Sequence, residues 1–364
     1  MNPEAPGPGA RTGPALIDAR WLGIGGPGRV AEHLLQGLHE IEPPGSWLVW
    51  GPDAVDPLLW PGATRIANRH HPKALYSQRE FPGPRAAKPR VAYYAHHLRP
   101  GWKIAPVEVT TVHDTIPFRY PPSRALAPLM RQYIAWMARR STLVVTDSEF
   151  SKASLQEDLG LAPERIAVLK LAIDHDAAGR VRELRKTTPP APRVMFVGRD
   201  APHKNLDRLV TAFAATDFAA AGAVLTLAGV DGPAVERLRA RAAASNARVE
   251  LPGIISQPAL EQLLASATLL VQPSLEEGFG LPVAEAMAAG IPVAISTAPA
   301  LLEITRGAPV QSFDPIDVEA MTATIDHVVA APGTMPELDW PRPVDFARSV
   351  LDAMARAEAL AKES

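Results

Sequence analysis

The segment PSLEEGFGLPVAEAM, residues 273–287, decides the fold of this chain. It directly follows the apolar run Leu269 to Val271, which predicts a buried strand. Pro282 has the fixed φ that the first turn of a helix favours, so we expect a helix to begin near Leu281. The loop between strand and helix therefore lies at the carboxyl end of a strand, where open parallel sheets bind ligands.

Two acidic residues of this segment are candidate ligand contacts: Glu277 before the helix and Glu285 about one turn into it. Carboxylates accept hydrogen bonds from paired hydroxyls, which a ribose and a hexose both offer, so the two can reach opposite ends of one extended ligand. The N–H groups near Gly280, Leu281 and Val283 form a helix start that suits a diphosphate. Acidic residues at this position can also simply stabilise a helix N-terminus.

The order of strand, loop and helix extends along most of the chain, which predicts α/β domains with parallel sheets and helices on both faces. A proline-rich stretch, Thr187 to Pro192, interrupts the order and suits an exposed linker. With 364 residues, two Rossmann-like domains are expected, over residues 15–185 and 192–335. The expected strands are Ala15–Asp18, Trp47–Trp50, Val107–Val112, Thr142–Val145, Val194–Val197, Ala223–Ala228, Arg248–Leu251, Leu269–Val271 and Pro292–Ile295.

The composition narrows the class of partner and compartment. A net charge of −2 gives no basic excess of the kind that nucleic-acid binders carry, so we expect none. The chain has no cysteine, which fits a reducing compartment, and we expect a cytoplasmic protein. Residues 1–14 lack an apolar run, and no stretch of about 18 apolar residues predicts a membrane-spanning helix.

The decisive segment resembles a motif of two glutamates with seven residues between them, found in the retaining glycosyltransferases of family 4, group 1 transferases of the two-Rossmann-domain GT-B fold. Glu277 and Glu285 have that spacing, and the continuation GIPV at 290–293 is also similar. The resemblance implies that Glu277 and the Gly278-Phe279-Gly280 backbone hold the donor sugar, while Glu285 holds the ribose.

A second matching segment is VGRDAPHKNL, residues 197–206. It resembles the family's Gly-Arg…Lys-Asn motif, which implies that Gly198 lines the donor site and that Arg199 and Lys204 clamp the diphosphate. Both cations suit a leaving group that gains negative charge. The family's counterpart of Gly253-Ile254-Ile255 lies beside the nucleobase, which makes Ile254 a donor-binding candidate, although a plain turn would look the same.

The first half supplies fewer candidates. TVHDTIP, residues 111–117, resembles the family's His-Asp segment, which implies that His113 faces the donor sugar, where it can donate a hydrogen bond or carry charge. GIGGPG, residues 23–28, fits the Gly-x-Gly-x-x-Gly pattern with Asp53 behind the next strand, so an NAD-dependent oxidoreductase is an alternative. The resemblance instead makes Gly25 and Gly26 part of the cleft lining. Ser148 is expected to cap a helix.

A basic zone lies between Thr64 and Lys103, where only Glu80 is acidic. It can attract an anionic acceptor or a membrane surface, or be a solvated loop region. The pairs His70-His71 and His96-His97 are expected to diverge, so no metal site is predicted. The basic residues are Arg65, Arg69, Lys73, Arg79, Arg85, Lys88, Arg90, Arg99 and Lys103.

Taken together, the resemblance implies a retaining, metal-independent glycosyltransferase without a cofactor. We expect it to move a hexosyl group, mannosyl from GDP-mannose as the leading choice, onto a glycan, lipid-linked or small-molecule acceptor. Residues 340–361 are expected to form a closing helix, with Asp345, Phe346, Ser349 and Leu351, that packs back on the first domain. The alternative from another class is a nucleotide-sugar-binding protein without turnover.

Overall fold

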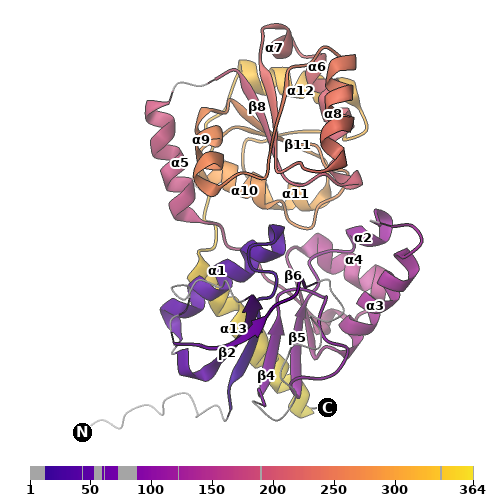
Figure 1. The fold of residues 1–364 in the computed structure, drawn as a ribbon, viewed down its shortest axis with the longest axis vertical. Helices are drawn as coiled ribbons and strands as arrows, with labels where there is room; N and C mark the ends of the chain where they lie inside the picture. Colours follow the sequence, from indigo (N-terminus) through magenta and orange to yellow (C-terminus); the bar gives the residue numbers. More distant parts are fainter. Residues whose placement is uncertain are drawn as a thin grey trace.

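The computed structural model describes residues 13–42, 44–52, 60, 62–72, 88–121, 123–188, 191–336 and 338–363. The chain forms two α/β lobes, one above the other in Figure 1. Asp53, Lys73, Arg79, Glu80 and Arg85, which entered the sequence predictions, lie outside the described residues, as do residues 1–12 and Pro189-Pro190 of the expected linker.

The first lobe is built on a parallel sheet with the strand order β3-β2-β1-β4-β5-β6-β7. This order reverses direction between β1 and β4, as in a dinucleotide-binding fold, and so creates a switch point at their carboxyl ends. Burial on both faces explains why most of its strands are plain apolar runs. Its strands are β1 (Ala15–Asp18), β2 (Trp47–Pro52), β3 (Thr64–Asn68), β4 (Val91–Tyr94), β5 (Val107–Thr111), β6 (Leu143–Thr146) and β7 (Ile166–Val168).

The second lobe repeats the arrangement with the order β10-β9-β8-β11-β12-β13, again parallel, and places its switch point between β8 and β11. The expected fold class, two Rossmann-like domains, is therefore confirmed. Its strands are β8 (Arg193–Val197), β9 (Val224–Ala228), β10 (Val249–Gly253), β11 (Leu269–Gln272), β12 (Val293–Ser296) and β13 (Gln311–Phe313).

Helices cover both faces of each sheet (Figure 1). None of them, within the described residues, is long and apolar enough to cross a membrane. They are α1 (Gly25–Ile41), α2 (Ile116–Arg119), α3 (Ala127–Arg140), α4 (Glu149–Leu159), α5 (His175–Thr187), α6 (Leu206–Ala214), α7 (Asp217–Ala220), α8 (Pro233–Ala244), α9 (Gln257–Ser266), α10 (Leu281–Ala288), α11 (Pro299–Ile304), α12 (Val318–Ala330) and α13 (Pro343–Glu363), with short 3₁₀ turns at Pro44–Ser46, Pro163–Arg165 and Pro202–Lys204.

Helix α5 belongs to a different lobe from the one the sequence predicted. The expected first domain ends at residue 185, but α5 packs against α9 and α10 of the second lobe. Arg180 forms an ion pair with Glu261 (2.7 Å), and Arg185 donates to the carbonyl of Ala267 (2.8 Å). These contacts place the boundary near Asp174, the N-cap of α5, ahead of the proline-rich stretch.

The last helix, α13, returns to the first lobe and packs along α1 and on strands β4, β5 and β6. It carries Asp345, Phe346, Ser349 and Leu351. The approach to α1 is close, because a Cβ added to Gly37 would lie only 2.0 Å from the carbonyl oxygen of Pro343. The chain thus crosses between the lobes twice, before α5 and before α13.

Candidate functional site

Lys204 and Glu277 meet at the switch point of the second sheet, in the loops that follow β8 and β11. The Lys204 ammonium lies 2.6 Å from Oε1 of Glu277, and Gln272 and Ser274 each donate to the same oxygen at 2.7 Å. Burial disfavours the charge on Glu277, but Lys204 and these hydrogen bonds prevail and hold its pKa below the ordinary value. The site therefore contains a fixed, ionised carboxylate at a strand end.

Asn205 joins the two loops. Its backbone is left-handed (φ 59°), which ends the turn at Lys204 and makes Asn205 the N-cap of α6. Its side-chain amide donates to the carbonyls of Pro273 (3.0 Å) and Pro315 (2.6 Å). Leu275 adds a backbone bond to His203 (2.7 Å). Within this pair, Lys204 therefore contacts Glu277 in the site, while Asn205 holds the loop in place.

The glycine loop leads into α10, which begins at Leu281 as expected. Gly280 has φ 107°, and a Cβ there would lie 2.5 Å from the side chain of Leu301, so glycine is required on both counts. We expected the N–H groups near Gly280, Leu281 and Val283 to bind an anion. The N–H of Val283 instead donates to the carbonyl of Gly280 (2.9 Å), within the first turn of the helix. The Phe279 ring is buried with its edge against Trp340, which leaves the backbone of this residue for a ligand.

Gly278 is the point where the first lobe touches this loop. Its carbonyl accepts from the hydroxyls of Ser148 (2.7 Å) and Ser151 (3.2 Å) at the start of α4. A Cβ on Gly278 would lie 2.9 Å from Oδ2 of Asp114, which follows β5. Ser148 caps α4, as expected, by accepting from the Ser151 N–H (3.0 Å), and it also bridges the lobes.

Two carboxylates of the second lobe extend this contact. The Arg119 guanidinium holds Glu276 with Nε 2.7 Å from Oε2. Glu303 accepts from the backbone N–H groups of Glu149 (2.9 Å) and Phe150 (3.1 Å), at the positive end of α4. The lobes therefore meet through charged and hydrogen-bonded groups around the glycine loop.

His113 lies across from that loop, but its ring is already engaged. Nδ1 is 2.7 Å from Oδ2 of Asp147, and Nε2 is 3.1 Å from the carbonyl of Ala95. Both neighbours are acceptors, which favours the doubly protonated ring. Burial opposes the charge, but Asp147 overrides it, and the pKa of His113 is raised. The expectation that His113 donates to a sugar hydroxyl does not match this geometry, because both ring N–H groups face protein acceptors.

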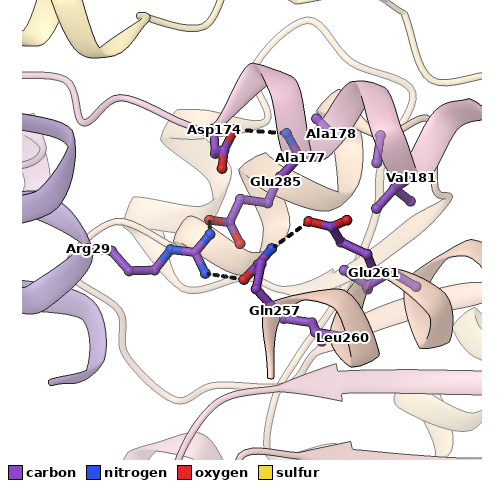
Figure 2. A pocket seen from close by; sticks show the side chains of 11 residues that line it. Arg29, Asp174, Ala177, Ala178, Val181, Gln257, Leu260, Glu261 and Glu285 are labelled. Carbon is purple, nitrogen blue, oxygen red and sulfur yellow. Dashed lines mark hydrogen bonds and ion pairs between the residues drawn. The ribbon is translucent and has the colours of Figure 1, made fainter. Parts of the chain in front are cut away.

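Glu285 faces a pocket between the lobes (Figure 2). Arg29 reaches over from α1, with Nη2 2.7 Å from Oε1 of Glu285 and Nη1 3.4 Å from Oε1 of Gln257. The pKa of Glu285 is raised above its ordinary value. Burial is the main cause, Arg29 lowers the pKa only in part, and the nearby Asp174 raises it further. The site thus contains two carboxylates on one loop and helix, each beside a cation.

The remaining predicted residues surround these groups without contacting them. Arg199 is exposed on the loop after β8 and makes no hydrogen bond or ion pair with the described residues, while Gly198 precedes it. Ile254, after β10, is 65% exposed. Gly25 and Gly26 open α1 with exposed backbone and no atom within 4 Å of an added Cβ.

No pattern in the sequence indicated the aromatic cluster that lies beside the switch point of the first sheet. Trp21 follows β1 and stacks on His96, with ring centroids 4.1 Å apart. The rings of His96 and His97 are 4.0 Å apart, so the expected divergence of this pair is wrong. Burial lowers the pKa of His97 to about 3, and its Nδ1 is buried without a hydrogen-bond partner. Nearest-neighbour side chains diverge in a regular strand, but these residues follow β4 in irregular backbone.

Two Rossmann-like lobes whose switch points face each other, with cations and carboxylates between them, define the GT-B class. Comparison with known families agrees: residues 182–338 match the model described as "Glycosyl transferases group 1", and residues 24–177 match "Glycosyltransferase Family 4". The two matches together span most of the chain. The protein belongs to the group 1 glycosyltransferases of GT-B fold.

Similar curated proteins include mannosyltransferases. An MMP alpha-(1->4)-mannosyltransferase of Mycolicibacterium hassiacum is 30% identical over 220 residues, 56% of this chain and 51% of that protein. O-antigen chain mannosyltransferase B of Escherichia coli is 28% identical over 237 residues, 60% of each chain. The matched segments thus span about half to three fifths of these relatives.

Solved structures share the fold over nearly the whole chain. A sucrose-phosphate synthase of Thermosynechococcus elongatus has a TM-score of 0.70 at 18% identity, over 96% of this chain and 97% of that one. The Anabaena protein HepE, in complex with UDP and glucose, has a TM-score of 0.66 at 15% identity, over 96% and 98%. At these identities the likeness concerns the fold alone.

Proposed function

We propose that the protein is a retaining glycosyltransferase that moves a hexosyl group from a nucleoside-diphosphate sugar to an acceptor hydroxyl. The observation that carries the proposal is the ion pair of Lys204 and Glu277 at the switch point, with Glu285 on the helix that follows. A cation, a sugar-binding carboxylate and a second carboxylate then lie along one extended ligand. Family membership and the mannosyltransferase names of the relatives support it.

At the diphosphate of the donor, the mechanism depends on positively charged groups. Lys204 has three N–H donors and Glu277 takes one, so the others can bind phosphate oxygens. Arg199, exposed beside it, adds a planar fork, and the start of α10 near Leu281 adds a positive dipole end. These groups stabilise the charge that develops as the diphosphate leaves, and they do so without a metal ion.

The sugar end rests on Glu277 and the glycine loop. The bonds that fix Glu277 all end on Oε1, so Oε2 is oriented to accept from hydroxyls of the donor sugar. The backbone of Gly278 to Gly280 lies beside it. As the bond between the anomeric carbon and the phosphate oxygen breaks, an oxocarbenium-like sugar forms. The acceptor oxygen bonds to the anomeric carbon on the face that the diphosphate leaves, and the departing diphosphate takes the hydroxyl proton. Retention of the anomeric configuration follows.

The nucleoside end is assigned to Glu285, which holds the ribose hydroxyls, and to Ile254, beside the base. The donor is GDP-mannose, because a Mycobacterium tuberculosis relative that is 36% identical over 126 residues, 34% of this chain, is named a GDP-mannose-dependent mannosyltransferase. A glucosyl donor is the second candidate, since a "2-deoxystreptamine glucosyltransferase" of Streptomyces kanamyceticus is 32% identical over 180 residues. The acceptor is a glycan, a lipid-linked sugar or a small molecule, bound on the first lobe near Gly25, Gly26 and His113.

A nucleotide panel tests the proposal in two stages. Thermal shift with GDP, UDP and dTDP identifies the base, because a ligand that binds only the folded state raises the melting temperature. Release of the nucleotide from the matching sugar donor, with and without an acceptor mixture and in excess EDTA, then tests transfer, and NMR of the product gives the anomeric configuration. A GDP-selective shift and EDTA-resistant turnover with retention are expected.

Each stage has its own contrary outcome. A shift without nucleotide release under any condition favours a binding protein that lacks turnover. A UDP-selective shift overturns GDP-mannose but keeps the transferase, and activity lost in EDTA and restored by magnesium overturns the metal-free mechanism. Glu285→Ala is the control for site-specific binding, because its shift should shrink for every nucleotide.

A further inference from the structure

Helix α3 presents an apolar face to solvent on the first lobe. Of the seven large apolar side chains exposed in the described part of the chain, three lie on this helix or at its N-cap: Leu126 (60% exposed), Leu129 (63%) and Trp136 (43%). A fourth, Trp102 (44%), lies in the loop after β4. That loop adjoins the helix, because a Cβ on Gly101 would lie 3.2 Å from the Trp136 ring. The opposite face of α3, with Ile134 and Ala138, packs in the core.

The charges around this face are positive. The Arg140 guanidinium lies over the Trp136 ring, 5.0 Å from its centroid, and Arg124 and Lys103 are exposed nearby. No acidic residue occurs between Thr115 and Thr146, nor between His96 and Val107. On the neighbouring α4, Asp158 is paired with Arg119 (3.1 Å). Arg124, Arg140 and Lys103 form no ion pair within the described part of the chain, and exposed tryptophan and leucine beside such cations are typical of a membrane-interface surface.

Within the described residues, the basic zone predicted from the sequence contributes little to this surface. Arg99 is buried in an ion pair with Glu108 (2.9 Å), and Arg90 pairs with Glu358 of α13. Of its two basic residues in the loop between β4 and β5, Arg99 is buried against α3 and Lys103 is exposed beside it. We therefore expect the membrane contact at α3 rather than through residues 64–103.

We propose that the α3 face, made of Trp102, Lys103, Leu126, Leu129, Trp136 and Arg140, docks the protein on an anionic lipid surface. Apolar side chains enter the interfacial layer while the cations contact lipid phosphates. A second copy of the chain fits less well, because a twofold dimer would bring the same cations of both copies together. In Figure 1, α3 lies on the outer side of its lobe with α2 and α4 toward the second lobe, so docking leaves the cleft free.

Vesicle sedimentation tests the proposal and needs neither donor nor acceptor, so it stands or falls apart from the proposed transferase activity. The full chain is mixed with vesicles of phosphatidylcholine alone or with added phosphatidylglycerol. We expect binding only with phosphatidylglycerol, weakening as salt rises. The double variant Leu126→Ser/Leu129→Ser should bind about tenfold or more weakly, and Arg140→Glu about fivefold or more weakly.

Matched variants on the second lobe serve as controls. Ile316 is as exposed as Leu129, at 63%, and Arg239 is an exposed helical arginine, so Ile316→Ser and Arg239→Glu should bind like the wild type. Circular dichroism verifies folding of every variant. Equal binding to both vesicle types, or equal loss in the α3 and control variants, overturns the proposal. So does a wild-type dimer that Leu126→Ser/Leu129→Ser dissociates while neither protein binds vesicles, because the face is then a contact between copies.

Discussion

Arg29 on α1 of the first lobe forms an ion pair with Glu285 on α10 of the second, with 2.7 Å between Nη2 and Oε1. The carboxylate assigned to the donor's ribose is therefore already occupied by a cation from the opposite lobe (Figure 2). A ribose that binds Glu285 must displace or share this arginine. Under the proposed assignment, the ion pair links nucleotide binding to the contact between the lobes.

The first prediction concerns this competition. Arg29→Ala removes the occupant of Glu285, so GDP should bind as tightly as to the wild type or up to about fivefold more tightly, the range of a partly exposed ion pair. Glu285→Ala removes the ribose contact and should weaken GDP binding about tenfold or more. Isothermal titration calorimetry measures both. Tenfold weaker binding by Arg29→Ala would instead show that Arg29 contacts the nucleotide.

The second prediction concerns pH and His33. Burial lowers the pKa of His33 to about 4, and its Nδ1 lies 3.0 Å from the carbonyl of Ala172. Between about pH 4 and 6.5 the unfolded chain binds a proton that the folded chain does not, so the stability contributed by neutral His33 is lost as pH falls through that window. The slope attributable to one such group reaches about 1.4 kcal/mol per pH unit.

His33→Gln tests this assignment, because glutamine can still donate to Ala172 but does not titrate. Urea unfolding at several pH values from 7 down to 5 should show a shallower loss of stability in the variant than in the wild type. If stability falls equally with pH in both proteins, His33 does not cause the pH dependence. His97 and His203 are then its source, because burial lowers their pKa values as well.

The third prediction separates two glycines of the site. Gly280→Ala places a Cβ against Leu301 at φ 107°, so it should destabilise the protein by about 1–3 kcal/mol. Gly26→Ala meets no atom within 4 Å and should leave the melting temperature unchanged. If Gly26 lines the cleft, as proposed, KM for donor or acceptor rises instead. Differential scanning fluorimetry and steady-state kinetics give the two readouts, and equal melting temperatures for both variants would contradict the packing argument.

The sequence predicted correctly that Lys204 and Glu277 lie together, because their order along the chain is enough to place them. Lys204 and Glu277 each follow a buried strand, and strands of one parallel sheet end at one edge, so their loops had to be neighbours. Pro282 likewise marked the start of α10. Strands β3 and β4 were missed, since TRIAN (64–68) is a partly exposed edge strand and VAYY (91–94) lies in a stretch dominated by basic residues.

Contacts between the lobes could not be found in this way. Arg29 and Glu285 are distant in sequence, and no local pattern in either helix indicates a partner. The lobe to which α5 belongs could not be predicted from the sequence either, because it depends on contacts with Glu261 and the carbonyl of Ala267 in the second lobe. The burial of Arg99 was hidden for a related reason, because it depends on Glu108, a charged residue inside the fully buried strand β5.

The final prediction concerns the groups around the diphosphate. Arg199→Ala and Lys204→Ala should each lower kcat about 100-fold or more, because their interactions strengthen as the leaving group gains charge. Glu277→Ala, which removes the contact with the reacting sugar, should resemble them. Glu285→Ala should chiefly raise KM, since the ribose changes little during the reaction. Steady-state kinetics at saturating donor separates the two effects.

Stability distinguishes the two cations. Arg199 is exposed and has no partner in the described residues, so Arg199→Ala should change the free energy of unfolding by less than about 0.5 kcal/mol. Lys204→Ala leaves the buried Glu277 carboxylate without its cation and should cost about 1–3 kcal/mol, the penalty of an unpaired buried group. Lys204→Met is the control for lost packing, because it keeps the chain length and removes the charge.

If Glu285→Ala were the most damaging to kcat while both cation variants were nearly silent, the diphosphate and ribose subsites would be wrongly assigned.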